Sequence, residues 1–217
     1  MQKMIDTIAH SRCEFIRTFL GQCVRINSHL QLTCCTVLLL GISPLGHATE
    51  FTQIVPAKSA LTFGYKQMGV PMDGKFGQFT AQMRFDPAQL GQAQARIDVN
   101  LASIDTGSAE ANEEVSGKLW FNTRAFPNGQ FVSSSVKALG GNRYQTLGTL
   151  TLKGKAVPVS AVFTFKPDGA TASFDGTFVL KRLDYGIGEG IWTDLGTVAN
   201  EIQIGFHLIV NAAPAKK

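Results

Sequence analysis

The chain has 217 residues with 20 Lys and Arg against 16 Asp and Glu, so its formal charge is +4, and 17% of its residues are charged. The hydrophobic content of 44% excludes a disordered chain, and the 22 glycines follow no period, which excludes a collagen-like repeat. At this length one domain of barrel or sandwich size is expected.

The first segment of the chain has the features of a secretory signal. An uncharged, largely apolar run covers residues 30–42, and small residues follow it up to Ala48. This run is too short to span a bilayer as a helix, and the small residues suit recognition by signal peptidase. We therefore predict that residues 1–48 are a signal peptide and that the mature protein is not membrane-spanning. Because the nearest charge before the run is Arg25, we hypothesise that the true start is Val24.

Removal of this segment limits the chemistry open to the mature domain, residues 49–217. The four cysteines lie within the first 35 residues, and the one histidine left is His207. Zinc, copper, haem and iron–sulfur sites thereby lose nearly all their usual ligands, so no metal site is predicted. The mature charge falls to +2, which gives no reason to expect a nucleic-acid partner.

Alternation of apolar and polar residues runs through nearly the whole mature region and predicts strands with one buried and one exposed face. The predicted strands are 59–66, 78–85, 94–101, 129–139, 148–152, 157–165, 172–180 and 198–210, of which the last is the longest. Turn signals separate them at 73–74, 86–87, 140–142, 153–155 and 167–169. Eight strands with short connections predict an all-β antiparallel fold, either a sandwich or a barrel, and closure removes exposed edges.

Two segments depart from the alternation. Residues 108–118 carry glutamates early and Lys118 at the end, which predicts a short helix with charges that suit its dipole. The aromatic stretch 119–127 has no period, and we interpret it as a cap over one end of the barrel. Residues 186–190 contain three glycines, which predicts a mobile rim at one mouth because glycine leaves the backbone few restraints.

The interior of an eight-stranded barrel is either filled by side chains or holds one ligand, and the pattern leaves both open. The inward positions are rich in Phe and carry no ionisable residue, which suits an apolar ligand. The residues predicted to line a tunnel are Phe63, Tyr65, Phe79, Met83, Phe85, Ile97, Val99, Trp120, Phe121, Phe131, Leu150, Phe163, Phe174, Phe178, Trp192, Ile202, Ile204 and Phe206.

A second interpretation is an enzyme. Asp184, Glu189 and Asp194 flank the glycine-rich loop, so a barrel hydrolase or isomerase could act on a small apolar substrate through a loop carboxylate such as Asp184. The alternation places His207 on the outer face, where a solvated role is expected. The sequence contains no G-x-S-x-G, phosphate-binding glycine loop or H-E-x-x-H, and no catalytic residue is assigned.

A series of short motifs runs in order along residues 50–211. They are Ser59–Phe63 with Gly69, Gly74–Phe76 before Phe79, Phe85–Pro87, Ser103–Gly107, Trp120–Asn122, Ala125–Pro127, Phe131 with Ser133, Gly148–Gly154 with Val157–Val159, and Leu183–Gly188. In their order and spacing these motifs resemble the YceI-like family of secreted, lipocalin-like proteins. The chain departs from the family in lacking a His before Trp120 and in having Asn122 where Asp is usual.

The resemblance implies an elongated eight-stranded antiparallel lipocalin-like barrel with a short helical cap, in the bacterial periplasm. It also implies that the tunnel takes a polyisoprenoid chain, an isoprenoid quinone or another long apolar lipid. We therefore expect a periplasmic binding or carrier protein with a bound lipid and no catalytic cofactor. Whether the protein forms a homodimer is left open.

Overall fold

The computed structural model describes residues 49–214. The predicted signal peptide, its cysteines and the hypothesised start at Val24 lie outside the described residues. Within them, no helix is long and apolar enough to cross a membrane.

The described chain is dominated by antiparallel strands, with one α-helix and five short 3-10 segments. The strands are β1 (Phe51–Ile54), β2 (Ala60–Gln67), β3 (Val70–Phe76), β4 (Phe79–Arg84), β5 (Gln94–Asn100), β6 (Ile104–Asp105), β7 (Asn128–Gly140), β8 (Arg143–Leu152), β9 (Lys155–Asp168), β10 (Thr171–Lys181) and β11 (Glu201–Ala212). The helix is α1 (Ala109–Ser116), and the 3-10 segments are η1 (Pro56–Lys58), η2 (Leu90–Gln92), η3 (Leu101–Ser103), η4 (Arg182–Tyr185) and η5 (Gly190–Thr193).

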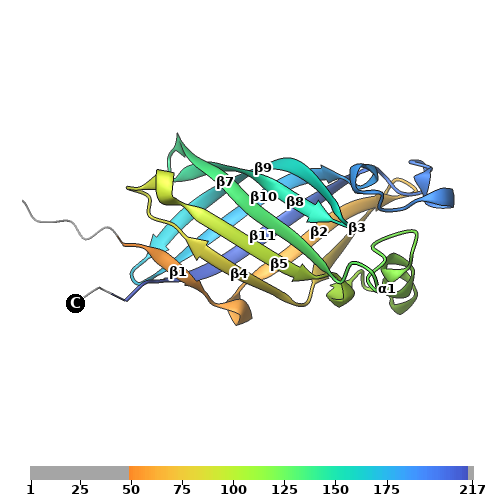
Figure 1. The fold of residues 1–217 in the computed structure, drawn as a ribbon, viewed down its shortest axis with the longest axis horizontal. Coiled ribbons are helices and arrows are strands. Elements are labelled where there is room, and N and C mark those ends of the chain that lie inside the picture. Colours follow the sequence, from red (N-terminus) through yellow and green to blue (C-terminus); the bar gives the residue numbers. More distant parts are fainter. Residues whose placement is uncertain (1–48, 215–217) are drawn as a thin grey trace, which may run out of the picture. The chain divides into compact units, whose positions relative to one another are not determined.

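The sheet runs in the order β4-β5-β7-β8-β9-β10-β11-β2-β3-β6, and β1 pairs with β11. A short connection joins β3 to β4, and only η3 lies between β5 and β6, so the two ends of this order come together and the sheet curls into a barrel. A bridge between Phe51 of β1 and Phe85 after β4 adds to the closure. Figure 1 shows the strands crossing the barrel obliquely, with α1 at one end and the C-terminus at the other.

The prediction of an all-β antiparallel barrel is confirmed, although the structure has eleven strands rather than eight. The additional strands are β1, β3 and β6, of four, seven and two residues. The longest strand is β9, with 14 residues, and β11 has 12, so the expectation that the last strand is longest is wrong.

The predicted turn at Asp73–Gly74 is also wrong. The chain turns at Met68 and Gly69, which have φ values of 50° and 82°, and β3 then runs through Gly74. A Cβ atom at Gly74 would lie 2.2 Å from the ring of Phe63, its partner on β2. This glycine therefore provides space for an aromatic ring across the strand pair, which is a common use of glycine within a sheet.

The predicted helix is confirmed as α1. Its first turn is capped by the Ser108 hydroxyl, which accepts a hydrogen bond of 3.3 Å from the backbone N–H of Ala111. Glu110 lies in the first turn, where a negative charge suits the helix dipole. The last turn holds no basic residue, because the helix ends at Ser116, before Lys118.

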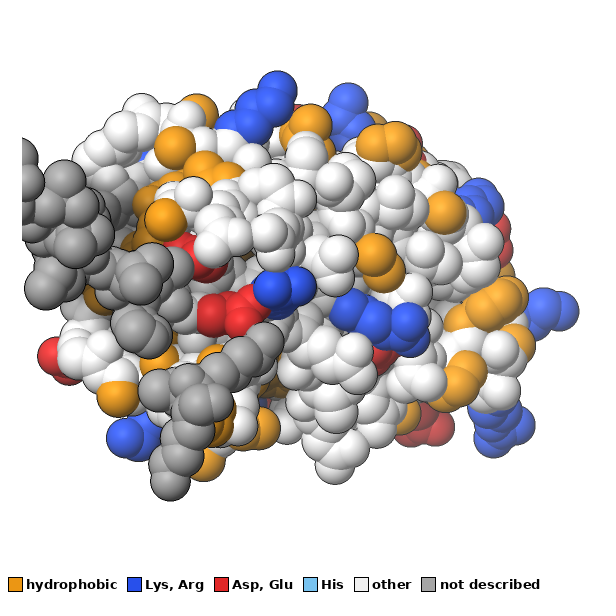
Figure 2. All heavy atoms as spheres, turned by 60° about the vertical axis from the view of Figure 1, so that its left-hand side comes forward, with side chains coloured by type: hydrophobic (Ala, Val, Ile, Leu, Met, Phe, Trp, Pro, Cys, Tyr) orange, Lys and Arg blue, Asp and Glu red, His pale blue; other side chains and the backbone are white. Residues whose placement is uncertain are grey.

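The outer surface carries the polar half of the alternation. Figure 2 shows Lys, Arg, Asp and Glu side chains scattered over one face, with hydrophobic ones among them. His207 lies on this outer surface, where its Nδ1 contacts the Asp175 carboxylate, so its predicted outward placement is confirmed.

Candidate ligand-binding cavity

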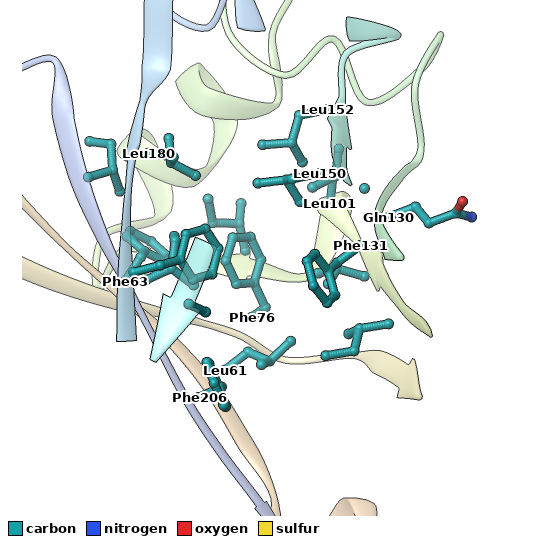
Figure 3. A pocket seen from close by; sticks show the side chains of 18 of the residues that line it. Leu61, Phe63, Phe76, Leu101, Gln130, Phe131, Leu150, Leu152, Leu180 and Phe206 are labelled. Carbon is teal, nitrogen blue, oxygen red and sulfur yellow. The ribbon is translucent and has the colours of Figure 1, made fainter. Parts of the chain in front are cut away.

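The barrel interior contains a cavity of about 500 Å³. This volume lies in the range of roughly 300–1,000 Å³ found for small-molecule sites. Figure 3 shows Leu61 and Phe63 of β2, Phe76 of β3 and Leu180 of β10 around this space, while the Gln130 amide points away from it. Part of the interior is thus packed with side chains and part of it is hollow.

The packed part is an aromatic cluster at the end remote from α1. The ring of Phe85 has its centroid 5.0 Å from that of Phe165 and 5.1 Å from that of Phe174. Phe51 joins the cluster from β1, and its ring meets Phe165 edge-on at 5.4 Å. Because Phe85 and Phe174 also border the cavity, this cluster forms its floor.

The structure brings together all the predicted lining residues except Phe79. Phe79 instead packs, partly buried, against the aromatic cluster. Sequence reasoning missed several apolar lining residues: Leu61, Phe76, Leu101, Ile104, Val115, Leu152, Leu180, Ile187, Val198 and Leu208. The alternation within the predicted strands already places several of them on the inward face, namely Leu61, Leu101, Leu152, Leu180 and Leu208. Phe76 was missed because the turn was misplaced.

The opposite end of the cavity is bordered by α1 and the loops beside it. Ala111 and Val115 line the cavity from α1, and the rings of Trp120 and Trp192 pack with centroids 5.3 Å apart. The indole N–H of Trp192 donates a hydrogen bond of 2.8 Å to Glu114 Oε1. This bond ties η5 to the helix. Trp120 and Phe121 of the stretch 119–127 border the cavity at this end, as expected of a cap.

The expectation of an interior without ionisable residues is wrong. Arg84, Glu110, Glu114 and Arg182 all border the cavity. The side chain of Arg182 is the most deeply placed, because the residue is 1% exposed. Burial lowers the pKa of its guanidinium, and its central carbon lies 5.6 Å from the centre of the Trp120 ring.

Backbone carbonyls accept hydrogen bonds from all five side-chain N–H groups of Arg182. Nε donates to Ala199 O at 3.1 Å, and Nη1 donates to the carbonyls of Ile187 and Gly188 at 3.0 and 3.1 Å. Nη2 donates to the carbonyls of Trp192 and Val198 at 2.6 and 2.8 Å. The guanidinium therefore fastens the chain from residue 187 to residue 199 around itself.

The glycine-rich loop is consequently well restrained, contrary to the expectation that its glycines leave few restraints. Gly188 has φ of 81°, and a Cβ there would lie 2.2 Å from Nη1 of Arg182. Lys153 adds a second tie, because its Nζ donates to Gly186 O at 2.7 Å and to Glu189 Oε2 at 3.0 Å. Gly186 and Gly188 therefore leave space for long cationic side chains, those of Lys155 and Arg182, to lie close to the backbone.

Two buried donors near the cap have no acceptor within residues 49–214. They are the Trp120 indole N–H and the Tyr185 hydroxyl. Burial, and to a lesser degree the negative charge of Asp184, raises the pKa of Tyr185 to about 12, so the phenol stays protonated at neutral pH.

The loop carboxylates considered for an enzyme do not border the cavity. Asp184 is exposed, and Glu189 pairs with Lys153. Asp194 accepts hydrogen bonds from the Gly196 N–H at 3.0 Å and the Thr197 hydroxyl at 2.9 Å, which lower its pKa. Within the described part of the chain, no three His, Cys, Asp or Glu side chains gather as metal ligands would.

This architecture defines a lipocalin-like barrel with an apolar internal cavity. Residues 53–210 match the YceI-like domain family, and the chain belongs to that family. A UPF0312 protein of Yersinia pestis is 28% identical over 151 residues, which cover 66% of this chain and 76% of that protein. A UPF0312 protein of Pseudomonas fluorescens is 31% identical over 142 residues, covering 60% of this chain and 70% of that protein.

Solved structures share the fold. BcnA of Burkholderia cenocepacia is 43% identical and superposes with a TM-score of 0.71, and the matched region covers 72% of this chain and 99% of the BcnA chain. A second neighbour is a polyisoprenoid binding domain from Saccharophagus degradans that is implicated in plant cell wall breakdown. It is 15% identical, with a TM-score of 0.58, and the match covers 77% of this chain and 100% of that domain's chain. At that identity the likeness concerns the fold alone.

Proposed function

We propose that this protein is a periplasmic carrier that holds one isoprenoid lipid or isoprenoid quinone in its barrel cavity and uses no catalytic cofactor. The observation that carries the proposal is the cavity of about 500 Å³, whose wall is mainly apolar. The proposed ligand-binding residues are those predicted from the sequence, without Phe79.

The energetics of burial favour a long apolar ligand. Each buried methylene contributes about 0.8 kcal/mol, so ten buried carbons contribute roughly 8 kcal/mol. That gain corresponds to about micromolar affinity before the cost of association is subtracted, and longer chains gain more. A ligand of this kind needs no strong polar contact in the barrel.

Two further observations support the proposal. The Saccharophagus domain that shares this fold is described as polyisoprenoid-binding. Residues 30–42 with Ala48 have the pattern of a cleaved export signal, which favours the periplasm as the place of action. An apolar lipid crossing an aqueous compartment needs a protein that covers it.

The test is organic extraction of protein purified without detergent from the periplasm of a bacterial host expressing the full chain. Mass spectrometry of the extract is expected to find close to one equivalent of an isoprenoid, and sequencing the protein is expected to find Thr49 at its N-terminus. Recovery of the folded protein from the cytoplasm alone would overturn the periplasmic assignment. A lipid-free protein that also fails to bind added farnesol would overturn the carrier function.

A further inference from the structure

The charged groups around the cavity are unevenly disposed. Arg84, Glu110, Glu114 and Arg182 are the Asp, Glu, Lys and Arg residues among the described cavity-lining set. Arg182 has no free N–H, because all five bind backbone carbonyls. Arg84 is the last residue of β4, and the Glu50 carboxylate that it contacts offsets its charge. Neither arginine is therefore an uncommitted cation for an anionic ligand.

The two glutamates lie one helical turn apart on α1, at the capped end of the cavity. Their hydrogen-bond donors are neutral: the Ser108 hydroxyl donates to Glu110 Oε2 at 2.7 Å, and the Trp192 indole donates to Glu114 Oε1 at 2.8 Å. The Ser108 hydroxyl and the backbone N–H of Glu110 lower the pKa of Glu110, which keeps it ionised. Among the ion pairs of residues 49–214, none includes either glutamate.

We propose that the cavity selects isoprenoid lipids with an uncharged polar end, such as a prenol or a quinone, and rejects prenyl phosphates, with Glu110 and Glu114 as the specificity-determining residues. This inference rests on the proposed lipid-carrier function. A phosphate at this end would meet two negative charges without an ionic partner and no free cation among the residues that line the cavity. Both glutamate side chains are exposed, so the repulsion acts through water and is strongest at low salt. An alcohol or carbonyl oxygen carries no such penalty.

The test compares farnesol with farnesyl diphosphate, which share one hydrocarbon chain and differ in the head group. Both tryptophans of the sequence, Trp120 and Trp192, border the cavity, so quenching of their fluorescence reports binding to the delipidated mature protein. In low salt we expect farnesol to bind at least about tenfold more tightly. The difference is expected to shrink when salt is raised to about 1 M, where charges are screened beyond about 3 Å.

The double substitution Glu110→Gln with Glu114→Gln is the decisive variant. Glutamine retains an acceptor oxygen for Ser108 and for Trp192 while it removes both charges. We expect diphosphate affinity to rise about tenfold and farnesol affinity to stay unchanged. Glu113→Gln is the matched control, because Glu113 is exposed like Glu110 and Glu114 on the same helix but does not border the cavity.

Several results would overturn this selectivity. Equal affinity of the wild type for the two ligands would do so, as would a double variant that keeps the wild-type ratio or a Glu113→Gln control that relaxes it equally. Tight diphosphate binding that disappears in Arg84→Gln would place the head group at the other end of the cavity and also overturn it. If the wild type binds neither ligand and its extract contains no lipid, the carrier function itself fails.

Discussion

Replacement of Arg182 by methionine tests whether one buried cation holds residues 187–199 in place beside the cavity. Methionine retains much of the aliphatic volume but leaves five backbone carbonyls, those of Ile187, Gly188, Trp192, Val198 and Ala199, without their donors. A buried acceptor left unpaired costs about 1–3 kcal/mol. Some of these carbonyls will bind water instead, and the variant no longer bears the cost of burying a guanidinium that has no carboxylate partner. We therefore expect the free energy of unfolding to fall by about 3–5 kcal/mol.

The consequence should be local as well as global. For a domain of this size each kcal/mol lowers Tm by about 2–4 °C, so a drop of roughly 6–20 °C is expected. Hydrogen exchange should accelerate in residues 187–199, whereas the middle of β9, which has strands on both sides, should keep its protection. Arg182→Lys should fall in between, because an ammonium has three donors where the guanidinium has five. Unchanged exchange in residues 187–199 of Arg182→Met would refute this account of the cap.

Three further predictions concern the barrel and its cavity. Phe178→Glu would put an unpaired charge at the cavity wall, so it should abolish lipid retention or cost several kcal/mol of stability, whereas Phe178→Leu should keep both fold and lipid. A folded Phe178→Glu variant that still carries a full equivalent of lipid would place the ligand outside the barrel. Gly74→Ala should destabilise the fold by about 1–3 kcal/mol in urea unfolding, because a Cβ would lie 2.2 Å from the Phe63 ring, and an unchanged midpoint would contradict that contact. Asp184→Asn should leave the lipid content of the extracted protein unchanged, because Asp184 does not border the cavity; loss of lipid would show that it does contribute to the site.

The barrel was predictable because its alternation is long and repeated. Strands such as β9 and β10 extend over 14 and 11 residues, and a period of two over such lengths is typical of a strand with one buried face. β6 has two residues and no pattern to detect, and β3 contains Asp73–Gly74, a pair that ordinarily favours a turn. The decisive fact about Gly74 is the ring of Phe63 on the neighbouring strand, and this pairing becomes visible only once the hairpin turn is placed at Met68 and Gly69.

The apolar wall of the cavity was predictable for the same reason, whereas the charged groups at the cap were not. Arg182 follows Lys181 and precedes Leu183-Asp184, so in sequence it reads as part of an exposed turn. Its burial depends on carbonyls contributed by residues 187–199 after the chain has folded back on itself. Glu114 is exposed, as its sequence suggests, but its hydrogen bond from Trp192, far away in sequence, could not be foreseen.

Cross-strand glycines also explain how a barrel so rich in phenylalanine keeps a hollow interior. A Cβ at Gly74 would lie 2.2 Å from Phe63, one at Gly148 would lie 2.5 Å from Phe131, and one at Gly176 would lie 2.3 Å from Phe206. Each of these rings lies over a glycine of an adjacent strand, against the wall, in the space that a side chain would otherwise occupy. Rings held in this way line the cavity without filling it. The volume available to a ligand therefore depends on which residues face each other across the strands as well as on how many aromatic side chains point inward.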